Sequence, residues 1–224
     1  MIEQPISEKL NKFFSGFKKL SFKKGELILR AGDKPPGIFY LKKGYTRLYS
    51  LSKDAQELTL IIFKAGNLFP LMWTLNDTPN MYYLEAMTAV EIHQAPREKF
   101  LNFIKNDNEL LFELTRRILM RFGGILNRME YAIFGHAHSK VASIILICAE
   151  RFGIQSKQDI IIQVPLTHQD IANLIGIARE TVSIEMEKLQ KKGLIDHQRK
   201  YLIIKNVRKL KEECALESID ENNL

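Results

Sequence analysis

The stretch Pro165–Ile195 constrains this chain more than any other, because it holds two short amphipathic segments separated by a glycine. Thr167 suits the N-cap of the first segment, and Asp170 three residues later can complete a capping box. Gly176 can turn the chain, and a second helix is expected from about Ala178. The core side chains of that helix would be Val182, Met186 and Leu189. Two helices joined by so short a turn predict a helix-turn-helix.

The second helix of this pair carries many hydrogen-bonding side chains on the face away from its core. These side chains belong to Arg179, Glu180, Thr181 and Ser183. Arginine can donate two hydrogen bonds to guanine, and glutamate can accept one from cytosine, so this face suits the edges of DNA bases. The alternative is a solvated helix start, where Glu180 only complements the helix dipole. The stretch alone leaves both interpretations open.

The residues that follow are strongly basic. Ile195–Ile204 predicts a β-hairpin around His197–Lys200, which would form a wing beside the two helices. Residues 188–211 contain nine Lys or Arg and one acid, Asp196, so their local charge of +8 exceeds the +7 of the whole chain. Such a concentration is typical of a surface that lies against nucleic-acid phosphates. The acidic tail from Glu212 is expected to fray.

A long helix is predicted over Asn108–Phe134, where apolar residues recur at steps of three or four. At a rise of 1.5 Å per residue it would be about 40 Å long, more than a compact domain needs. The near-heptad seam therefore predicts a dimerisation helix. Its expected interface residues are Leu111, Leu114, Ile118, Phe122, Ile125 and Met129. The alternative is a helix that only packs on the domain before it.

The region from Leu20 to about His93 has a different texture. Strand-length β-rich runs alternate there with Gly, Pro and Asp turns, which predicts an all-β roll or sandwich. An amphipathic helical segment is expected before it, in residues 1–20. Pro96–Lys105 predicts a short helix after it. The expected fold class is α+β.

The opening of this β-rich region, FKKGELILRAGDKPPGIFYLKKGYTRLY, resembles that of a cyclic-nucleotide-binding β-roll. Phe22, Gly25, Glu26, Gly32, Asp33 and Gly44 occupy the positions that recur in that fold. A roll, a long helix and a winged helix-turn-helix occur in this order in the Crp/Fnr family of bacterial transcription regulators, and the resemblance covers nearly the whole chain. It implies a β-roll domain in residues 1–107, a dimerisation helix in 108–135 and a DNA-binding domain in 136–224.

The resemblance also implies roles for single residues. Arg179 and Glu180 would read bases, Thr181 would contact a phosphate, and Ser183 would lie near the bases. Ile184 stands where the family usually has a second arginine, and isoleucine can meet a thymine methyl group instead. The turn that contacts the DNA backbone is Thr167, His168 and Gln169, and Lys188, Arg199 and Lys200 complete the predicted interface. The implied partners are double-stranded DNA, a second copy of the chain and RNA polymerase.

The part of the roll that would bind a cyclic nucleotide departs from the family pattern. Pro70-Leu71 replaces a Gly-Glu pair, no Arg stands near Tyr82–Tyr83, and no Lys or Arg occurs between Gly66 and Ala95. A phosphate would lack its counter-charge, so control by cyclic AMP or GMP is not expected, and the effector is unknown. Another small molecule could still occupy an apolar pocket, formed by Leu71, Met72, Trp73, Tyr82, Tyr83, Arg121 and Gly124. The alternative is that these side chains simply fill the roll.

Composition narrows the remaining function classes. The chain has no cysteine before Cys148, and neither Cys148 nor Cys214 belongs to a CxxC pair, so no iron–sulfur cluster is expected. His136 and His138 alternate, but two histidines without a further ligand cluster make a poor metal site, and none is predicted. A cupin-like enzyme would need several metal ligands in the roll, which carries only His93. We therefore expect a cytoplasmic, non-enzymatic protein without a signal peptide or membrane segment.

Overall fold

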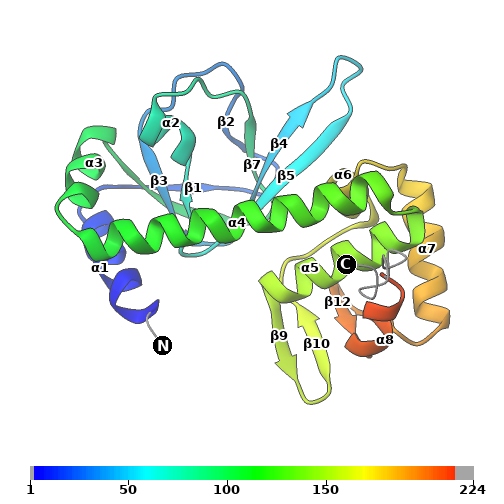
Figure 1. Cartoon of the computed structure of the whole chain (residues 1–224). Coiled ribbons are helices and arrows are strands. Elements are labelled where there is room, and N and C mark those ends of the chain that lie inside the picture. Colours follow the sequence, from blue (N-terminus) through cyan, green and yellow to red (C-terminus); the bar gives the residue numbers. More distant parts are fainter. Residues whose placement is uncertain (1–2, 215–224) are drawn as a thin grey trace, which may run out of the picture. The chain divides into compact units, whose positions relative to one another are not determined.

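The computed structural model describes residues 3–214 and divides the chain into two compact units, 1–120 and 121–224 (Figure 1). The division falls inside one helix, α4 (Asn108–Phe134), whose bounds agree with the long helix expected from the sequence. The compact units share this helix, whereas the domain boundaries expected from the sequence lie on either side of it. Among the described residues, no helix is both long and apolar enough to cross a membrane.

The described part of the first unit is a β-roll with helices at its start and end. Its antiparallel sheets have the strand orders β1-β8-β3-β6 and β2-β7-β4-β5. The strands are β1 (Lys18–Phe22), β2 (Leu27–Leu29), β3 (Ile38–Lys43), β4 (Tyr45–Leu51), β5 (Glu57–Lys64), β6 (Leu68–Phe69), β7 (Tyr83–Ala86) and β8 (Val90–Ala95). The helices before α4 are α1 (Glu3–Ser15), α2 (Leu71–Asn76) and α3 (Arg97–Lys105).

The expected helical segment of residues 1–20 is shorter in the structure. Helix α1 ends at Ser15, and Lys18 already begins a strand that pairs with Gln94 of β8. Hydrogen bonding to β8 thus decides the conformation of residues that the apolar spacing alone assigned to a helix. Gly44 connects β3 to β4 with φ of +88°, and a Cβ there would lie 2.3 Å from the Ala89 carbonyl oxygen. That close approach requires glycine.

Two apolar clusters hold the first unit together. One lies inside the roll and includes Phe39, Phe63, Phe69 and Leu84. The other joins the helices to the roll, with α1, α3 and the first turns of α4 packed together through Phe14, Phe100, Leu110 and Leu114 among others. Packing of this second cluster fixes the start of α4 against the roll.

The second unit continues from α4 into a winged helical domain. Its elements are α5 (Ala137–Phe152), β9 (Gly153–Ser156), β10 (Asp159–Ile162), α6 (His168–Ile175), α7 (Arg179–Lys191), β11 (Ile195–Gln198), β12 (Tyr201–Ile204) and α8 (Val207–Glu212). The strands form one antiparallel sheet in the order β11-β12-β10-β9. The predicted wing hairpin is confirmed, with Gln198 opposite Tyr201.

Hydrogen bonds decide two local details of the second unit. Gln155 and Ser156 belong to β9, because they pair with β10, the strand that follows. Ser139 lies in the first turn of α5, and the N-cap of this helix is His136. The Ser139 hydroxyl donates back to the His136 carbonyl at 3.0 Å. A serine inside a helix can donate to the carbonyl of the preceding turn in this way.

Candidate nucleic-acid interface

The helix-turn-helix begins at the capping box predicted for α6. The Thr167 hydroxyl accepts from the Asp170 backbone N–H at 3.1 Å, and the Asp170 carboxylate accepts from the Thr167 backbone N–H at 2.8 Å. Gly176 ends the helix in the left-handed conformation, with φ of 70°. These three residues fix where α6 starts and where the chain turns into α7.

Helix α7 buries one face and exposes another, as its spacing predicts. Val182, Met186 and Leu189 are buried. Arg179, Glu180 and Ile184 are exposed, the last with 54% of its surface accessible. Thr181 and Ser183 are partly exposed at the side of the same helix. The structure therefore brings the predicted base-reading residues together on one accessible helix face.

A histidine connects the predicted backbone-contact turn to this face. His168 Nδ1 lies 2.8 Å from the Ser183 hydroxyl, which itself donates to the Arg179 carbonyl at 3.0 Å. Because the hydroxyl already donates its single proton to Arg179, His168 Nδ1 must donate to it. The side chain of Gln169 instead donates to Asn173 at 2.7 Å, within α6. His168 thereby links the start of α6 to the first turns of α7.

The wing is attached to the same surface. His197 of β11 has its Nδ1 2.9 Å from the Gln190 amide nitrogen of α7, and its ring lies 6.2 Å from that of His168. Burial lowers the pKa of His197, and the neighbouring His168 lowers it further. Arg199 at the tip of the hairpin has φ of +59°, and Arg199 and Lys200 are both exposed. The tip thus presents two adjacent cations to solvent.

Much of the basic charge in residues 188–211 is paired with carboxylates, so the exposed positive charge there is smaller than the sequence window of +8 indicates. Within the described residues, five of the nine cations form ion pairs: Lys188 with Glu185, Lys191 with Glu187, Lys192 with Glu213, Lys205 with Asp159, and Arg208 with Glu212. All five carboxylates lie outside the sequence window that showed a charge of +8. The exposed charge is therefore most concentrated at the wing tip.

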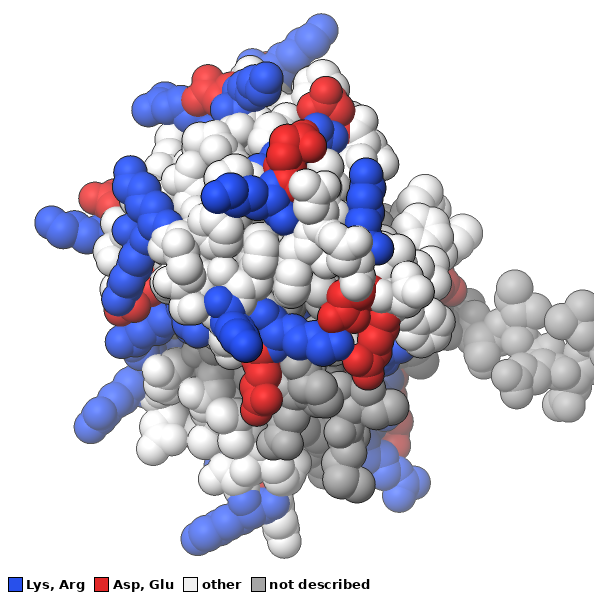
Figure 2. All heavy atoms as spheres, turned by 90° about the vertical axis from the view of Figure 1, so that its left-hand side faces the viewer, with Lys and Arg blue, Asp and Glu red and all other residues white. Residues whose placement is uncertain are grey.

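The face of the molecule drawn in Figure 2 carries basic residues of a different arrangement. Figure 2 shows lysine and arginine side chains scattered over one face of the molecule, among carboxylates and uncharged residues. A mixed surface of this kind gives a weak field toward a polyanion, because opposite charges screen one another. The helix-turn-helix and wing are the better candidates for a DNA-binding surface.

The predicted seam of α4 is only partly exposed. Leu111, Ile118, Phe122, Ile125 and Met129 are accessible, whereas Leu114 is only 7% accessible. Leu114 belongs to the core that joins α4 to the roll, and this burial corrects its assignment to the seam. The sequence reasoning missed a parallel row of exposed apolar residues at intervals of seven: Phe112, Leu119, Leu126 and Ile133. A search for one strict heptad would have found them.

The predicted effector pocket does not form a single site within either unit. Leu71, Met72, Trp73, Tyr82 and Tyr83 lie in the first unit, whereas Arg121 and Gly124 lie in the part of α4 that belongs to the second. Met72 is exposed. An open hollow of about 670 Å³ lies elsewhere in the first unit, along β2, with Phe22, Glu26, Ile28, Arg30, Asp33 and Lys34 in its lining.

Two aromatic members of the predicted effector pocket, Trp73 and Tyr83, are in contact with an arginine or another ring. Trp73 is buried under the Arg97 guanidinium, which donates to the Thr74 carbonyl at 2.9 Å. Tyr83 stacks on Tyr49, with 5.2 Å between ring centroids. These contacts agree with the alternative that the side chains fill the roll.

The two cysteines and the alternating histidines, His136 and His138, are the residues to consider for metal or redox chemistry. Burial raises the pKa of the Cys148 thiol to about 12, and also that of Cys214 to about 12. Both thiols are therefore protonated at neutral pH. Within residues 3–214, no three His, Cys, Asp or Glu side chains are grouped as metal ligands. His136 lies against Ser139, and His138 is engaged by two carboxylates.

Comparison with known proteins agrees with this architecture. Residues 19–107 match the family model of the cyclic nucleotide-binding domain, and residues 139–213 match that of the Crp-like helix-turn-helix domain. The global nitrogen regulator of a Nostoc species is 27% identical over 190 residues, which cover 84% of this chain and 85% of that protein. Roll, long helix and winged helix-turn-helix together define a DNA-binding transcription regulator.

Solved structures show the same fold. A CooA mutant from Carboxydothermus hydrogenoformans superposes with a TM-score of 0.75 at 21% identity, covering 91% of this chain and 90% of that chain. A CRP/FNR-family transcriptional regulator from Thermus thermophilus gives 0.69 at 23% identity, covering 88% and 98%. The chain belongs to the Crp/Fnr family, whose members are transcription regulators and not enzymes.

Proposed function

We propose that this regulator binds a specific, near-palindromic DNA site as a homodimer and that cyclic AMP does not control it. The observation that carries the proposal is the accessible first part of α7, where Arg179, Glu180 and Ile184 share one exposed face. A helix presented in this way can enter the major groove with its N-terminal residues against base edges. The exposed Arg199 and Lys200 of the wing supply charge for the adjacent phosphates.

The exposed stripe on α4 supports the homodimer. Phe122 and Met129 form its centre, and rows of apolar residues flank them on both sides. The helix is 27 residues long, and a stripe at heptad spacing along it matches the pattern of a two-stranded coiled coil. Pairing of two such helices would bring two copies of α7 to one DNA duplex. Half-sites would then lie one helical turn apart, about 34 Å.

Ile184 supports a half-site of unusual sequence. Its side chain is 54% accessible and lies on the base-reading face of α7. An isoleucine cannot donate hydrogen bonds to guanine, but it can pack against the methyl group of thymine. We infer a thymine at the position where an arginine in this place would select guanine.

Independence from cyclic AMP is supported by the engagement of two arginines of the first unit with protein groups. Arg97, whose guanidinium lies over Trp73 of α2, donates to the Thr74 carbonyl. Arg47 of β4 is paired with the carboxylates of Glu57 and Glu85. The position before α2 is Pro70, which has no backbone N–H to donate to a phosphate. RNA polymerase is inferred as a further partner from the family alone.

A sensor that still requires a small metabolite is the second candidate. Among the described residues, the hydroxyl of Thr46 and Nδ1 of His93 are buried in the roll without a hydrogen-bond partner. Buried polar atoms usually have a partner, so a polar ligand or a water molecule would be favourable there. The two candidates differ in whether the isolated protein binds DNA without an added effector.

The test is selection of binding sequences from random DNA by the purified protein, followed by affinity measurements with and without cyclic AMP and with a metabolite extract. We expect an enriched near-palindrome and the same affinity in the presence of cyclic AMP. Enrichment only in the presence of the extract would favour the sensor. Enrichment of no sequence under any condition would contradict specific DNA binding.

A further inference from the structure

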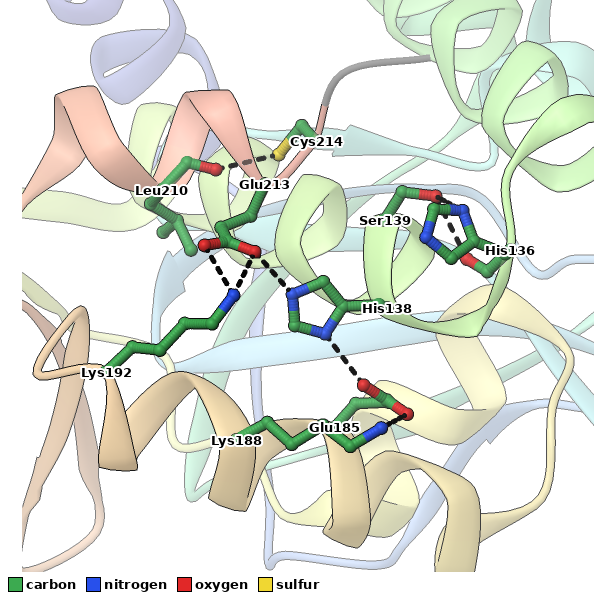
Figure 3. A network of polar contacts seen from close by, with 9 residues as sticks. All are labelled: His136, His138, Ser139, Glu185, Lys188, Lys192, Leu210, Glu213 and Cys214. Carbon is green, nitrogen blue, oxygen red and sulfur yellow. Dashed lines mark hydrogen bonds and ion pairs between the residues drawn. The ribbon is translucent and has the colours of Figure 1, made fainter. Parts of the chain in front are cut away.

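His138 lies at the centre of a chain of ion pairs on the buried side of α7 (Figure 3). Its Nδ1 is 2.7 Å from the Glu185 carboxylate, and its Nε2 is 2.8 Å from the Glu213 carboxylate. Lys188 donates to Glu185 at 2.7 Å, and Lys192 donates to Glu213 at 2.7 Å. Two lysines and one histidine thus alternate with two carboxylates.

The two carboxylates are ionised at neutral pH. Burial by itself would raise the pKa of Glu185, but hydrogen bonds from Lys188 and His138 hold it below the ordinary value. The hydrogen bond from Lys192, together with that from His138, lowers the pKa of Glu213 against the opposing effect of burial. An ionised carboxylate only accepts hydrogen bonds. Neither glutamate can therefore donate to the imidazole.

This geometry requires the charged form of His138. A neutral imidazole carries one N–H, so one of its nitrogens would present a lone pair to a carboxylate. An imidazolium donates from both nitrogens and satisfies both glutamates. The His138 side chain is only 17% accessible and the Glu185 side chain 9%, so water cannot easily replace a lost contact.

The charged groups around the imidazole come from several elements. Glu185 and Lys188 belong to helix α7, and Lys192 is its C-cap. Glu213 is the C-cap of α8. On the α4 side, Tyr131 lies near Cys214, the neighbour of Glu213, and its pKa is raised mainly by burial. Glu185 sits between Val182 and Leu189 on the buried face of the helix that exposes Ile184 on the other.

We propose that the His138 imidazolium is a positioning residue for α7. Deprotonation of His138 then loosens the position of α7, so DNA binding weakens as the pH rises. This inference rests on the proposed function. When His138 loses its proton, one contact with a carboxylate is lost, either at Glu185 of α7 or at Glu213 beyond α8. Loss at Glu185 removes a contact between α5 and α7, and loss at Glu213 removes a contact between α5 and the end of α8.

The isosteric variant Glu185→Gln tests the protonation step. A glutamine amide can donate to the lone pair of a neutral imidazole, whose other nitrogen then donates to Glu213, so the variant stays connected at high pH. The matched control is Glu187→Gln, an exposed glutamate of the same helix that pairs with Lys191. Each protein would be assayed on a duplex carrying the selected site from about pH 6 to about pH 9, the range in which imidazoles titrate.

We expect the wild type and Glu187→Gln to lose about tenfold more affinity than Glu185→Gln across this range, as the loss of a hydrogen bond to a charged group implies. His168 and His197 also face the proposed DNA surface, but they are present in all three proteins and cancel in the comparison. Equal pH profiles for Glu185→Gln and Glu187→Gln would overturn the inference.

A measurement without DNA separates this inference from the proposed function. Nitrogen-15 correlation spectra of the free protein report whether both His138 ring nitrogens carry protons. We expect the imidazolium at neutral pH in the wild type and in Glu187→Gln, and a neutral imidazole in Glu185→Gln. A neutral His138 in the wild type would refute the positioning role even if DNA binds. Failure to select any DNA site would instead refute the proposed function and leave the spectra interpretable.

Discussion

Arg128 of α4 donates a 2.6 Å hydrogen bond to the backbone carbonyl of Leu174, in the last turn of α6. The final carbonyls of a helix lack partners inside the helix and form the negative end of its dipole. A guanidinium at this end of α6 supplies a hydrogen-bond donor for a carbonyl and a positive charge that complements the helix dipole. Within the second unit, this bond joins the second half of the long helix to the helix-turn-helix.

We predict that Arg128→Met destabilises the second unit. The variant keeps the aliphatic stem but leaves the Leu174 carbonyl without this donor, which should cost about 1.5–3 kcal/mol. Urea unfolding followed by circular dichroism measures the change. Arg208→Met is the matched control, because Arg208 has a side chain that is 92% accessible and should change stability little. Equal effects of the two substitutions would contradict the assigned role.

The wing tip should contribute to affinity without reading sequence. Arg199→Gly removes a cation at a position with φ of +59°, where glycine fits without strain, so the hairpin should persist. We expect weaker binding to all duplexes and a decrease of about one in the slope of log affinity against log salt. Salt titrations of the selected site and of an unrelated duplex measure both effects. A change confined to the selected site would argue for base contact instead.

Ile184 should determine one base pair of the half-site. Because its exposed side chain offers only apolar contact, Ile184→Arg should change the preference there from thymine toward guanine, a discrimination of about 1–3 kcal/mol. Repeating the selection from random DNA with the variant measures this preference directly. Glu187→Gln, farther along the helix, should leave the selected sequence unchanged. An identical site for Ile184→Arg and wild type would remove Ile184 from the base-reading set.

The stripe of α4 should hold two copies of the chain together. Leu119→Lys and Leu126→Lys each place a charge in the exposed heptad row, where a partner helix would have to bury it. We expect either variant to be monomeric by light scattering at concentrations where the wild type is dimeric. Asn127→Lys is the control, since Asn127 is exposed on another face of α4. A wild type that is monomeric would contradict the homodimer.

Glu113 should make the first unit sensitive to acid. Hydrogen bonds from Arg116 and then Arg117 lower the pKa of its buried carboxyl from 4.5 to about 2. The folded state binds the proton more weakly than the unfolded state, so this stabilisation is complete above about pH 4.5 and is lost as the pH falls toward about 2. Thermal unfolding against pH should show a steeper acid decline in the wild type than in Glu113→Gln. Parallel curves would show that the ion pairs do not stabilise the fold.

The sequence alone predicted most of the secondary structure of the second unit, because its signals are local. The capping box of Thr167 and Asp170 and the turn at Gly176 depend on residues within a few positions of one another, and the structure confirms all three. The spacing of Val182, Met186 and Leu189 likewise gave the buried face of α7. Helix caps and helix periodicity are encoded over short stretches, so they can be read without the fold.

Tertiary structure decided the features that depend on partners far apart in the chain. Leu114 has the spacing of a seam residue, yet the roll buries it. Two cations of the basic stretch have carboxylate partners that the local sequence does not reveal: Glu213 for Lys192 and Asp159 for Lys205. His138 gave only a poor metal motif, and the fold placed it between Glu185 and Glu213, 47 and 75 residues away. Burial and charge pairing arise from the packing of distant segments, so only the folded chain determines them.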